Sequence, residues 1–276
     1  MQKEYMFLQI SDLHFGKESI YGNYDMDSDL RNEMINDMIK MKNKYSFNID
    51  GVLICGDIAF SGKKSEYVIA EEFIEKIREK LDVEMEKVFC VPGNHDVDQS
   101  TVKNRLAIYA LQKLLENANV VNLSHYLGQM FGNADGVNND AQLLYEPIAA
   151  YNDFADKHSA RLNIKNPYID YEFELDEGYQ LIIHSMNSTL VSNSEDHNWK
   201  NHTEKKMIID TNQIPKSSPK KIYMTLCHHP VEYWKDDEDI LKEKLNKRAK
   251  IQLFGHTHEQ SIYLENEYVR LISGAL

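Results

Sequence analysis

Carboxylates and histidines recur in this chain directly after short apolar runs. Five such groups follow one another along the sequence: Asp12 with His14, Asp57, Asn94 with His95 and Asp96, His228 with His229, and His256 with His258. Imidazoles, carboxylates and one amide, without a set of thiolates, suit divalent ions such as Zn, Mn, Fe or Ni. A single D-x-H or H-x-H triplet is weak evidence, but five groups in this order predict a metal site.

The apolar runs before these groups are typical of β-strands. They cover residues 5–10, 51–55, 87–91, 179–184, 221–227 and 250–254. Apolar residues at helical spacing indicate helices at 29–45 and after Ser65, which suits an N-cap. Alternating strands and helices predict parallel pairing, and the carboxyl ends of parallel strands meet at one edge of a sheet. The five polar groups should therefore lie together.

Other segments suggest how one domain over residues 1–276 is organised. Residues 101–165 have a mostly helical pattern, which we interpret as an insertion covering one side of the site. Residues 235–250 alternate acids and bases, which is typical of a solvated helix. The strand-like residues 271–276 favour the N-terminal part of a longer protein, and the alternative is a short strand that ends the chain.

Composition limits the classes of function. The formal net charge of −13 argues against broad binding of nucleic-acid phosphates, which requires clustered Lys and Arg. No apolar run approaches the roughly 20 residues that span a bilayer, and the first residues lack a signal-peptide pattern. Three cysteines, Cys55, Cys90 and Cys227, form no even framework and are expected to be packing residues. We therefore expect a cytoplasmic protein that does not bind membranes.

The motif series D-x-H, G-D, G-N-H-D, His and G-H-x-H resembles the calcineurin-like metallophosphoesterase family between Tyr5 and His258. Its G-H-x-H ending resembles the phosphodiesterases and nucleases more than the protein phosphatases. The resemblance implies an α/β fold, a four-layer α/β/β/α sandwich with two mixed β-sheets, and two metal ions at the sheet ends. It implies one ion held by Asp12, His14, Asp57 and His258, and a second held by Asp57, Asn94, His228 and His256.

The expected chemistry follows from these residue types. A carboxylate such as Asp57 can bridge two cations about 4 Å apart, and the cations lower the pKa of a shared water so that a metal-bridging hydroxide attacks the phosphorus. His95, which resembles the family's histidine near the leaving group and is expected to pair with Asp96, would protonate the leaving oxygen. Asn94 and His95 are expected to contact the substrate. Asn187 is a further candidate, with an ordinary turn as its alternative.

Several alternatives stay open. His229 could replace His228 at the metal, and four other histidines in polar text are expected at the surface: His125, His158, His197 and His202. We expect hydrolysis of phosphodiesters, or of phosphomonoesters, on a nucleotide-type substrate. The alternatives are a protein phosphatase, a metal-dependent nuclease that is the effector of a larger protein with a C-terminal sensor or oligomerisation domain, and a scaffold of the same fold without catalysis.

Overall fold

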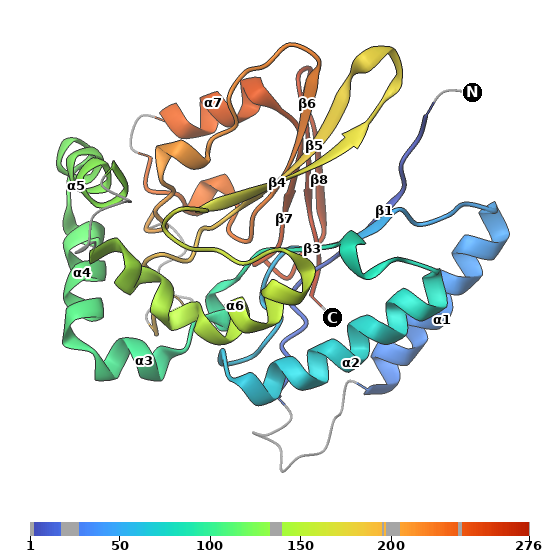
Figure 1. Cartoon of the computed structure of the whole chain (residues 1–276), viewed down its shortest axis with the longest axis horizontal. Helices are drawn as coiled ribbons and strands as arrows, with labels where there is room; N and C mark the ends of the chain where they lie inside the picture. The colour runs from blue at the N-terminus through green and yellow to red at the C-terminus, as the bar shows by residue number, and fades with distance from the viewer. Residues whose placement is uncertain are drawn as a thin grey trace.

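Two β-sheets form the centre of the molecule, and helices cover their outer faces (Figure 1). This computed structural model describes residues 3–17, 28–132, 140–194, 196, 205–236 and 239–275. One apolar cluster fills the space between the sheets, and two others lie between a sheet and its helices. The layers run helix, sheet, sheet, helix, as the predicted fold class requires.

The smaller sheet has the strand order β1-β2-β3, with β1 at Phe7–Ile10, β2 at Gly51–Ile54 and β3 at Val88–Cys90. Its described pairs are all parallel, and Ile10, Ile54 and Cys90 are aligned across it. The connections are α1 (Ser28–Tyr45), α2 (Lys64–Leu81) and η2 (Met85–Lys87). The three strands therefore end side by side, directly before the first three polar groups.

Helix α2 begins two residues earlier than the predicted cap implies. Lys63 is the N-cap, and the side chain of Glu66 accepts a hydrogen bond of 2.9 Å from the Lys63 backbone N–H. Ser65 lies within the first turn, so the prediction that it is the N-cap is wrong. The acid at the third helical position satisfies a backbone donor that would otherwise have no partner at the helix start.

The larger sheet is mixed and has the order β4-β5-β6-β7-β9-β8. Its strands are β4 (Tyr168–Glu174), β5 (Gln180–Met186), β6 (Lys221–Leu226), β7 (Ala249–Phe254), β8 (Ser261–Leu264) and β9 (Val269–Ile272). β5, β6, β7 and β9 are parallel neighbours, whereas β4 and β8 are antiparallel edge strands. The six strands predicted from the sequence are all present, as β1, β2 and β3 of the smaller sheet and β5, β6 and β7 of the larger one. The expectation of mixed pairing holds for this sheet, while the described pairs of the smaller sheet are parallel.

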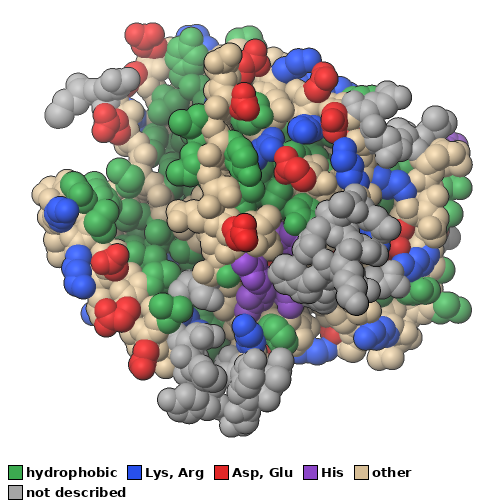
Figure 2. Space-filling model, turned by 180° about the vertical axis from the view of Figure 1, so that it is seen from behind, with side chains coloured by type: hydrophobic (Ala, Val, Ile, Leu, Met, Phe, Trp, Pro, Cys, Tyr) green, Lys and Arg blue, Asp and Glu red, His purple; other side chains and the backbone are tan. Residues whose placement is uncertain are grey.

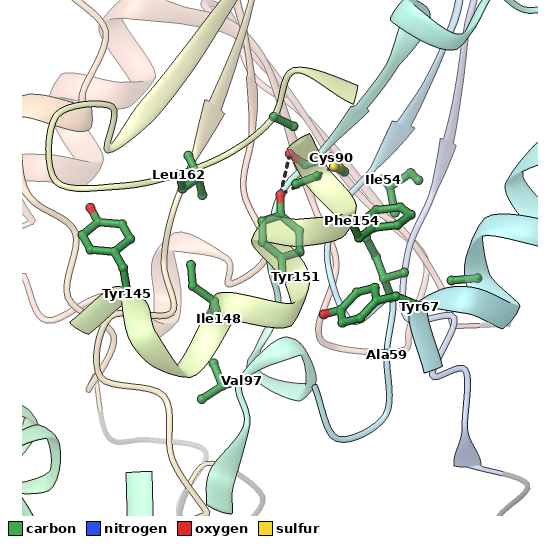
Figure 3. Close-up of a cluster of buried hydrophobic side chains, with 14 of the residues drawn as sticks. Ile54, Ala59, Tyr67, Cys90, Val97, Tyr145, Ile148, Tyr151, Phe154 and Leu162 are labelled. Atoms are coloured by element: carbon green, nitrogen blue, oxygen red, sulfur yellow. Dashed lines mark hydrogen bonds between the residues drawn. The ribbon is translucent and has the colours of Figure 1, made fainter. Parts of the chain in front are cut away.

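The helical segment of residues 101–165 packs on the smaller sheet and beside the larger one. It contains α3 (Gln99–Asn104), α4 (Leu106–Asn117), α5 (Val120–Gly132), η4 (Asp140–Ile148), α6 (Ala149–Ala155) and η5 (Asp156–His158). Figure 3 shows α6 side chains in the core, where the Tyr151 hydroxyl donates to the Cys90 carbonyl over 3.1 Å. Burial of each such large side chain contributes about 1.5–3 kcal/mol. The predicted helical content is confirmed.

Helix α7 (Ile240–Arg248) covers the other face of the larger sheet and buries Leu245 while Ile240 stays exposed, as predicted for a solvated helix. Short 3-10 helices also occupy loops of the described residues: η3 (Asn94–Asp96), η6 (Asp176–Gly178), η8 (Thr211–Gln213) and η9 (Val231–Tyr233). Within the described ranges, no helix has the length and apolar character that crossing a membrane requires. All three cysteines are buried and free, one in each apolar cluster, which agrees with packing.

The four histidines that were predicted at the surface divide into three cases. His125 on α5 is exposed, as predicted. His158 is only 3% exposed and packs against Phe154, so its predicted surface position is wrong. The last turn of the helical segment folds this ring inward, although the surrounding sequence is polar. His197 and His202 lie outside the described residues.

Candidate metal centre

The predicted ligands lie in loops at the carboxyl ends of strands from both sheets. Five of these residues have backbones in the left-handed region, with φ between 49° and 72°: Asp12, His14, Asp57, His256 and His258. This conformation costs a residue other than glycine of order 1–3 kcal/mol and is common where function requires it. Backbone hydrogen bonds from Asp12 to Gly56, 3.1 Å, and from His14 to Asp57, 3.0 Å, hold two of these loops together.

The side chains of these loops converge. Four overlapping sets of ligand atoms lie within 4.8 Å of one another: Asp12, His14 and His258; His14, Asp57 and His95; Asp12, Asp57 and His228; and His228, His229 and His256. Histidine side chains reach the surface together on the face shown in Figure 2, where they are purple. The structure therefore brings together residues from all five groups of the sequence.

Asp12, His14 and His258 form one half of the cluster. The Nε2 atom of His258 lies 3.3 Å from Asp12 Oδ1 and 3.3 Å from Nε2 of His14. The other oxygen of Asp12 accepts hydrogen bonds from Ser11 Oγ, 2.5 Å, and from the His256 backbone N–H, 3.1 Å. Asp12 Oδ1 is buried, and His258 Nε2 is the one polar side-chain atom recorded near it among the described residues. A buried carboxylate oxygen left in this state fits a metal ligand.

Asn94, His228 and His256 form the other half. Asn94 Oδ1 lies 3.0 Å from His228 Nε2 and 3.0 Å from His256 Nδ1. The Nδ1 atom of His228 donates to the Cys55 carbonyl over 2.7 Å, which turns its Nε2 toward Asn94. A histidine ligand held through its second nitrogen in this way has a fixed ring orientation and tautomer.

Asp57 lies between the two halves. Its Oδ2 atom is 3.4 Å from His228 Nε2 and 3.9 Å from His14 Nε2, and its Oδ1 accepts a 2.8 Å hydrogen bond from the His95 backbone N–H. Gly93 permits this approach, because a Cβ there would lie 2.2 Å from Asp57 Oδ1. A carboxylate between two sets of imidazoles has the position that a bridging ligand requires.

The surroundings of Asp96 correct the predicted His95–Asp96 pair. The Nδ1 of His95 donates to the Phe60 carbonyl over 2.7 Å. The fully buried carboxylate of Asp96 instead accepts hydrogen bonds from Gly93 N, 2.8 Å, Ala59 N, 2.9 Å, and the Tyr67 hydroxyl, 2.7 Å. Asp96 therefore joins the loop of Asp57 to the loop of Asn94 and is a positioning residue.

His229 belongs to one of the four sets, whereas Asn187 belongs to none. His229 Nδ1 is 2.8 Å from Ser188 Oγ, and its buried Nε2 has no hydrogen-bond partner. His228 faces Asp57 and Asn94 directly, so the geometry favours His228 over its neighbour. Asn187 is fully buried, and its Oδ1 accepts from both N and Oγ1 of Thr189 over 2.8 Å. The turn alternative therefore describes Asn187, which offers no exposed surface to a substrate.

Burial and charge set the protonation of the cluster. Burial would lower the pKa of His228, but the carboxylates of Asp57 and Asp12 raise it to about 9. Burial would raise the pKa of Asp57, but His228 beside it keeps that pKa well below its ordinary value. Burial lowers the pKa of His14 to about 4, and burial together with His228 lowers that of His256 to about 3. At neutral pH, His14 and His256 therefore offer free lone pairs.

A family model described as calcineurin-like phosphoesterase matches residues 5–260. This chain belongs to the calcineurin-like phosphoesterase family. Membership implies a centre of two divalent metal ions, and the residues present fit it: a buried carboxylate oxygen on Asp12, a shared carboxylate on Asp57, an amide oxygen and neutral imidazoles.

One curated protein is similar to this chain in sequence, and solved structures are similar to it in fold. An uncharacterised metallophosphoesterase-like protein of Bacillus subtilis, YydB, is 25% identical over 98% of this chain and 53% of its own length. This calcineurin-like chain therefore spans about half the length of that curated relative. A dimetal phosphatase of Danio rerio is 12% identical, with 98% of this chain and 87% of that chain covered and a TM-score of 0.45. A phosphopantetheinyl hydrolase of Mycobacterium tuberculosis is 11% identical, with 100% and 91% covered and a TM-score of 0.46.

Metal binding to this chain should release a proton from His228. Its pKa of about 9 lies above the ordinary value near 6.5, so without metal the ring is protonated below pH 9 and is stabilised by Asp57. A ligand nitrogen must lose that proton. We expect calorimetric titration with Mn at pH 7.5, in buffers of different ionisation enthalpy, to give release of about one proton that disappears above pH 9. Release that is unchanged in His228→Gln would contradict this assignment.

Proposed function

We propose that this chain hydrolyses phosphodiester bonds, with phosphomonoesters as poorer substrates, and that its substrate is of the nucleotide type. The observation that carries the proposal is the place of the Asp57 carboxylate between two sets of imidazoles, with Oδ2 3.4 Å from His228 and 3.9 Å from His14. Such a carboxylate can be shared by two cations, and two-metal sites of this kind stabilise both the attacking and the leaving oxygen.

We assign the ligands in two sets that share one member. The first set is Asp12, His14, Asp57 and His258, and the second is Asp57, Asn94, His228 and His256. Manganese is the ion we would test first. When bound, two divalent ions would lower the pKa of a water to near neutrality and offset negative charge on the phosphoryl group. Asn94 adds a ligand oxygen without charge, so it does not repel the phosphate.

His95 supplies the proton for the leaving oxygen in this proposal. Its backbone N–H and its Nδ1 are both used, by Asp57 at 2.8 Å and by the Phe60 carbonyl at 2.7 Å. These two hydrogen bonds fix the ring, and we assign the proton transfer to Nε2, the ring nitrogen that does not donate to Phe60. The ring centroid of His95 lies 4.5 Å from that of His14, so a phosphate near the metals is within reach.

Charge supports a small nucleotide over a nucleic acid. The chain carries a formal net charge of −13, and extensive binding of a duplex requires neutralisation of many phosphates by Lys and Arg. A nucleotide presents one or a few phosphate groups, which the metal centre can neutralise locally. The preference for diesters has its support in the G-H-x-H motif of His256 and His258, which resembles that of the family's phosphodiesterases.

Metal removal tests the proposed function. The chain would be stripped with a chelator and reloaded separately with Mn, Fe, Zn or Ni, and hydrolysis of bis-p-nitrophenyl phosphate and p-nitrophenyl phosphate would be followed. We expect activity to fall at least about 100-fold on stripping, to return with Mn, and to be greater on the diester. Absence of hydrolysis with every ion, together with a metal content near zero, would identify a scaffold without catalysis.

A further inference from the structure

Two aromatic side chains flank the row of candidate ligands. The ring centroid of Phe60 lies 5.2 Å from that of His95 and 6.2 Å from that of His14. The ring of Tyr233 stands on edge against His256, with centroids 4.6 Å apart and an interplanar angle of 88°. Phe60 therefore borders the half of the cluster that contains His14, and Tyr233 borders the half that contains His256.

Both rings are partly exposed, and their backbones are fixed. Phe60 donates from its N–H to the Phe15 carbonyl over 2.9 Å, while its own carbonyl holds His95. Tyr233 donates to the Pro230 carbonyl over 3.0 Å, and its carbonyl accepts from the N–H groups of Lys206, 3.0 Å, and Met207, 2.9 Å. A rigid aromatic ring left in contact with water beside a polar site is suited to binding another flat group, because little entropy is lost.

The two rings come from the same loops that carry candidate ligands. Phe60 is three residues after Asp57 in the loop that follows β2. Tyr233 is five residues after His228 in the loop that follows β6. Hydrophobic side chains adjoin the exposed histidines in Figure 2. A group esterified to a phosphate that is bound at the candidate ligands would therefore extend past an aromatic side chain.

We propose that Phe60 and Tyr233 recognise a planar unsaturated group of the substrate, namely a nucleobase, by stacking on both sides of the metal centre. This proposal rests on the proposed function and adds the residues that determine substrate preference. Phe60 lies beside His95, so it contacts the base of a nucleoside leaving group. Tyr233 contacts the substituent on the opposite side of the phosphate. Stacking requires no positive charge, which agrees with an acidic protein.

Binding of two ligands that differ only in the base tests this proposal. Adenosine 5′-monophosphate and ribose 5-phosphate would be titrated calorimetrically into the full chain loaded with Mn. We expect the wild type to prefer the nucleotide by about 10-fold, because stacking of one base contributes about 1–3 kcal/mol. Phe60→Ala should reduce this ratio several-fold, whereas Phe60→Tyr should keep it. Tyr233→Ala should instead reduce several-fold the preference for bis-p-nitrophenyl phosphate, which has a ring on both sides of the phosphate, over p-nitrophenyl phosphate, which has one. Tyr233→Phe should keep that preference. Tyr45→Ala, an exposed aromatic of α1 at 56% exposure, is the matched control.

The outcomes separate this proposal from the proposed function. A wild-type ratio near one in a chain that hydrolyses bis-p-nitrophenyl phosphate overturns the stacking proposal alone. A chain that binds neither ligand and hydrolyses nothing overturns both. If Phe60→Ala loses its circular dichroism spectrum, Phe60→Leu decides, since it keeps an apolar side chain without a π-face. Retention of the wild-type ratio in Phe60→Leu overturns the role of Phe60, and retention of the wild-type preference for the diester in Tyr233→Ala overturns the role of Tyr233.

Discussion

Replacement of Asp57 by Asn should reduce metal-dependent hydrolysis by about 1000-fold or more. The substitution keeps the size of the side chain but removes the charge that two ions would share, and loss of several kcal/mol of charge stabilisation corresponds to this factor. It also leaves His228 without its closest carboxylate, at 3.4 Å, so the pKa of that histidine should fall toward its ordinary value. Kinetics on bis-p-nitrophenyl phosphate and the metal content per chain would both be measured, and we expect fewer than two ions.

Asp82→Asn is the matched control for this variant. Asp82 is also an aspartate with a left-handed backbone, φ 61° against 51° for Asp57, but it is exposed and ends helix α2. The two variants therefore make the same chemical change in similar backbone conformations, one at the centre and one away from it. Two ions and wild-type activity in Asp57→Asn would show that this carboxylate is not shared between metals.

The sequence predicted the convergence of the ligands because each polar group follows a strand. Ile10, Ile54 and Cys90 are aligned in the smaller sheet, so Asp12, Asp57 and Asn94 emerge next to one another. Strand order in parallel α/β folds has strong geometric rules, and these rules place residues that are distant in sequence at one edge. The types and order of the residues were therefore sufficient to predict the cluster.

The two edge strands of the larger sheet, β4 and β8, were not predictable from apolar runs. β4, Tyr168–Glu174, alternates apolar residues with Asp170, Glu172 and Glu174, because one face contacts the other sheet and the opposite face carries charge. β8, Ser261–Leu264, leaves Ile262 62% and Leu264 75% exposed, so burial does not mark it. Edge strands of this kind are half solvated, and their pairing depends on the neighbouring strand more than on their own composition.

Hydrogen bonds to the backbone explain the remaining differences. His95 is held by the carbonyl of Phe60 and Asp96 by the N–H groups of Gly93 and Ala59. Every residue has a backbone carbonyl and nearly every one an N–H, so residue types do not reveal such partners. The sequence suggested an ion pair because a histidine and an aspartate are adjacent, but both side chains bond to backbone groups of the loop that contains Ala59 and Phe60 rather than to each other.

Replacement of His95 by Gln should lower kcat without loss of metal. A positioned general acid contributes typically about 10²–10⁴-fold, and the benefit grows as the leaving group becomes a poorer acid. The decrease should therefore be large for a diester with an alkyl leaving group and about 10-fold for one that releases p-nitrophenol, which leaves readily without a proton. Rates on both substrates and the metal content per chain are the measurements.

The metal content decides between two interpretations of His95. Its ring lies in one of the possible metal sets, with His14 and Asp57, so geometry alone also permits a ligand. A ligand would lose an ion on substitution and affect both substrates equally, whereas a proton donor keeps two ions and distinguishes the leaving groups. His125→Gln, at an exposed position of α5, makes the same chemical change away from the centre and should have no effect. An equal loss of activity on both diesters would therefore identify His95 as a metal ligand and not as the proton donor.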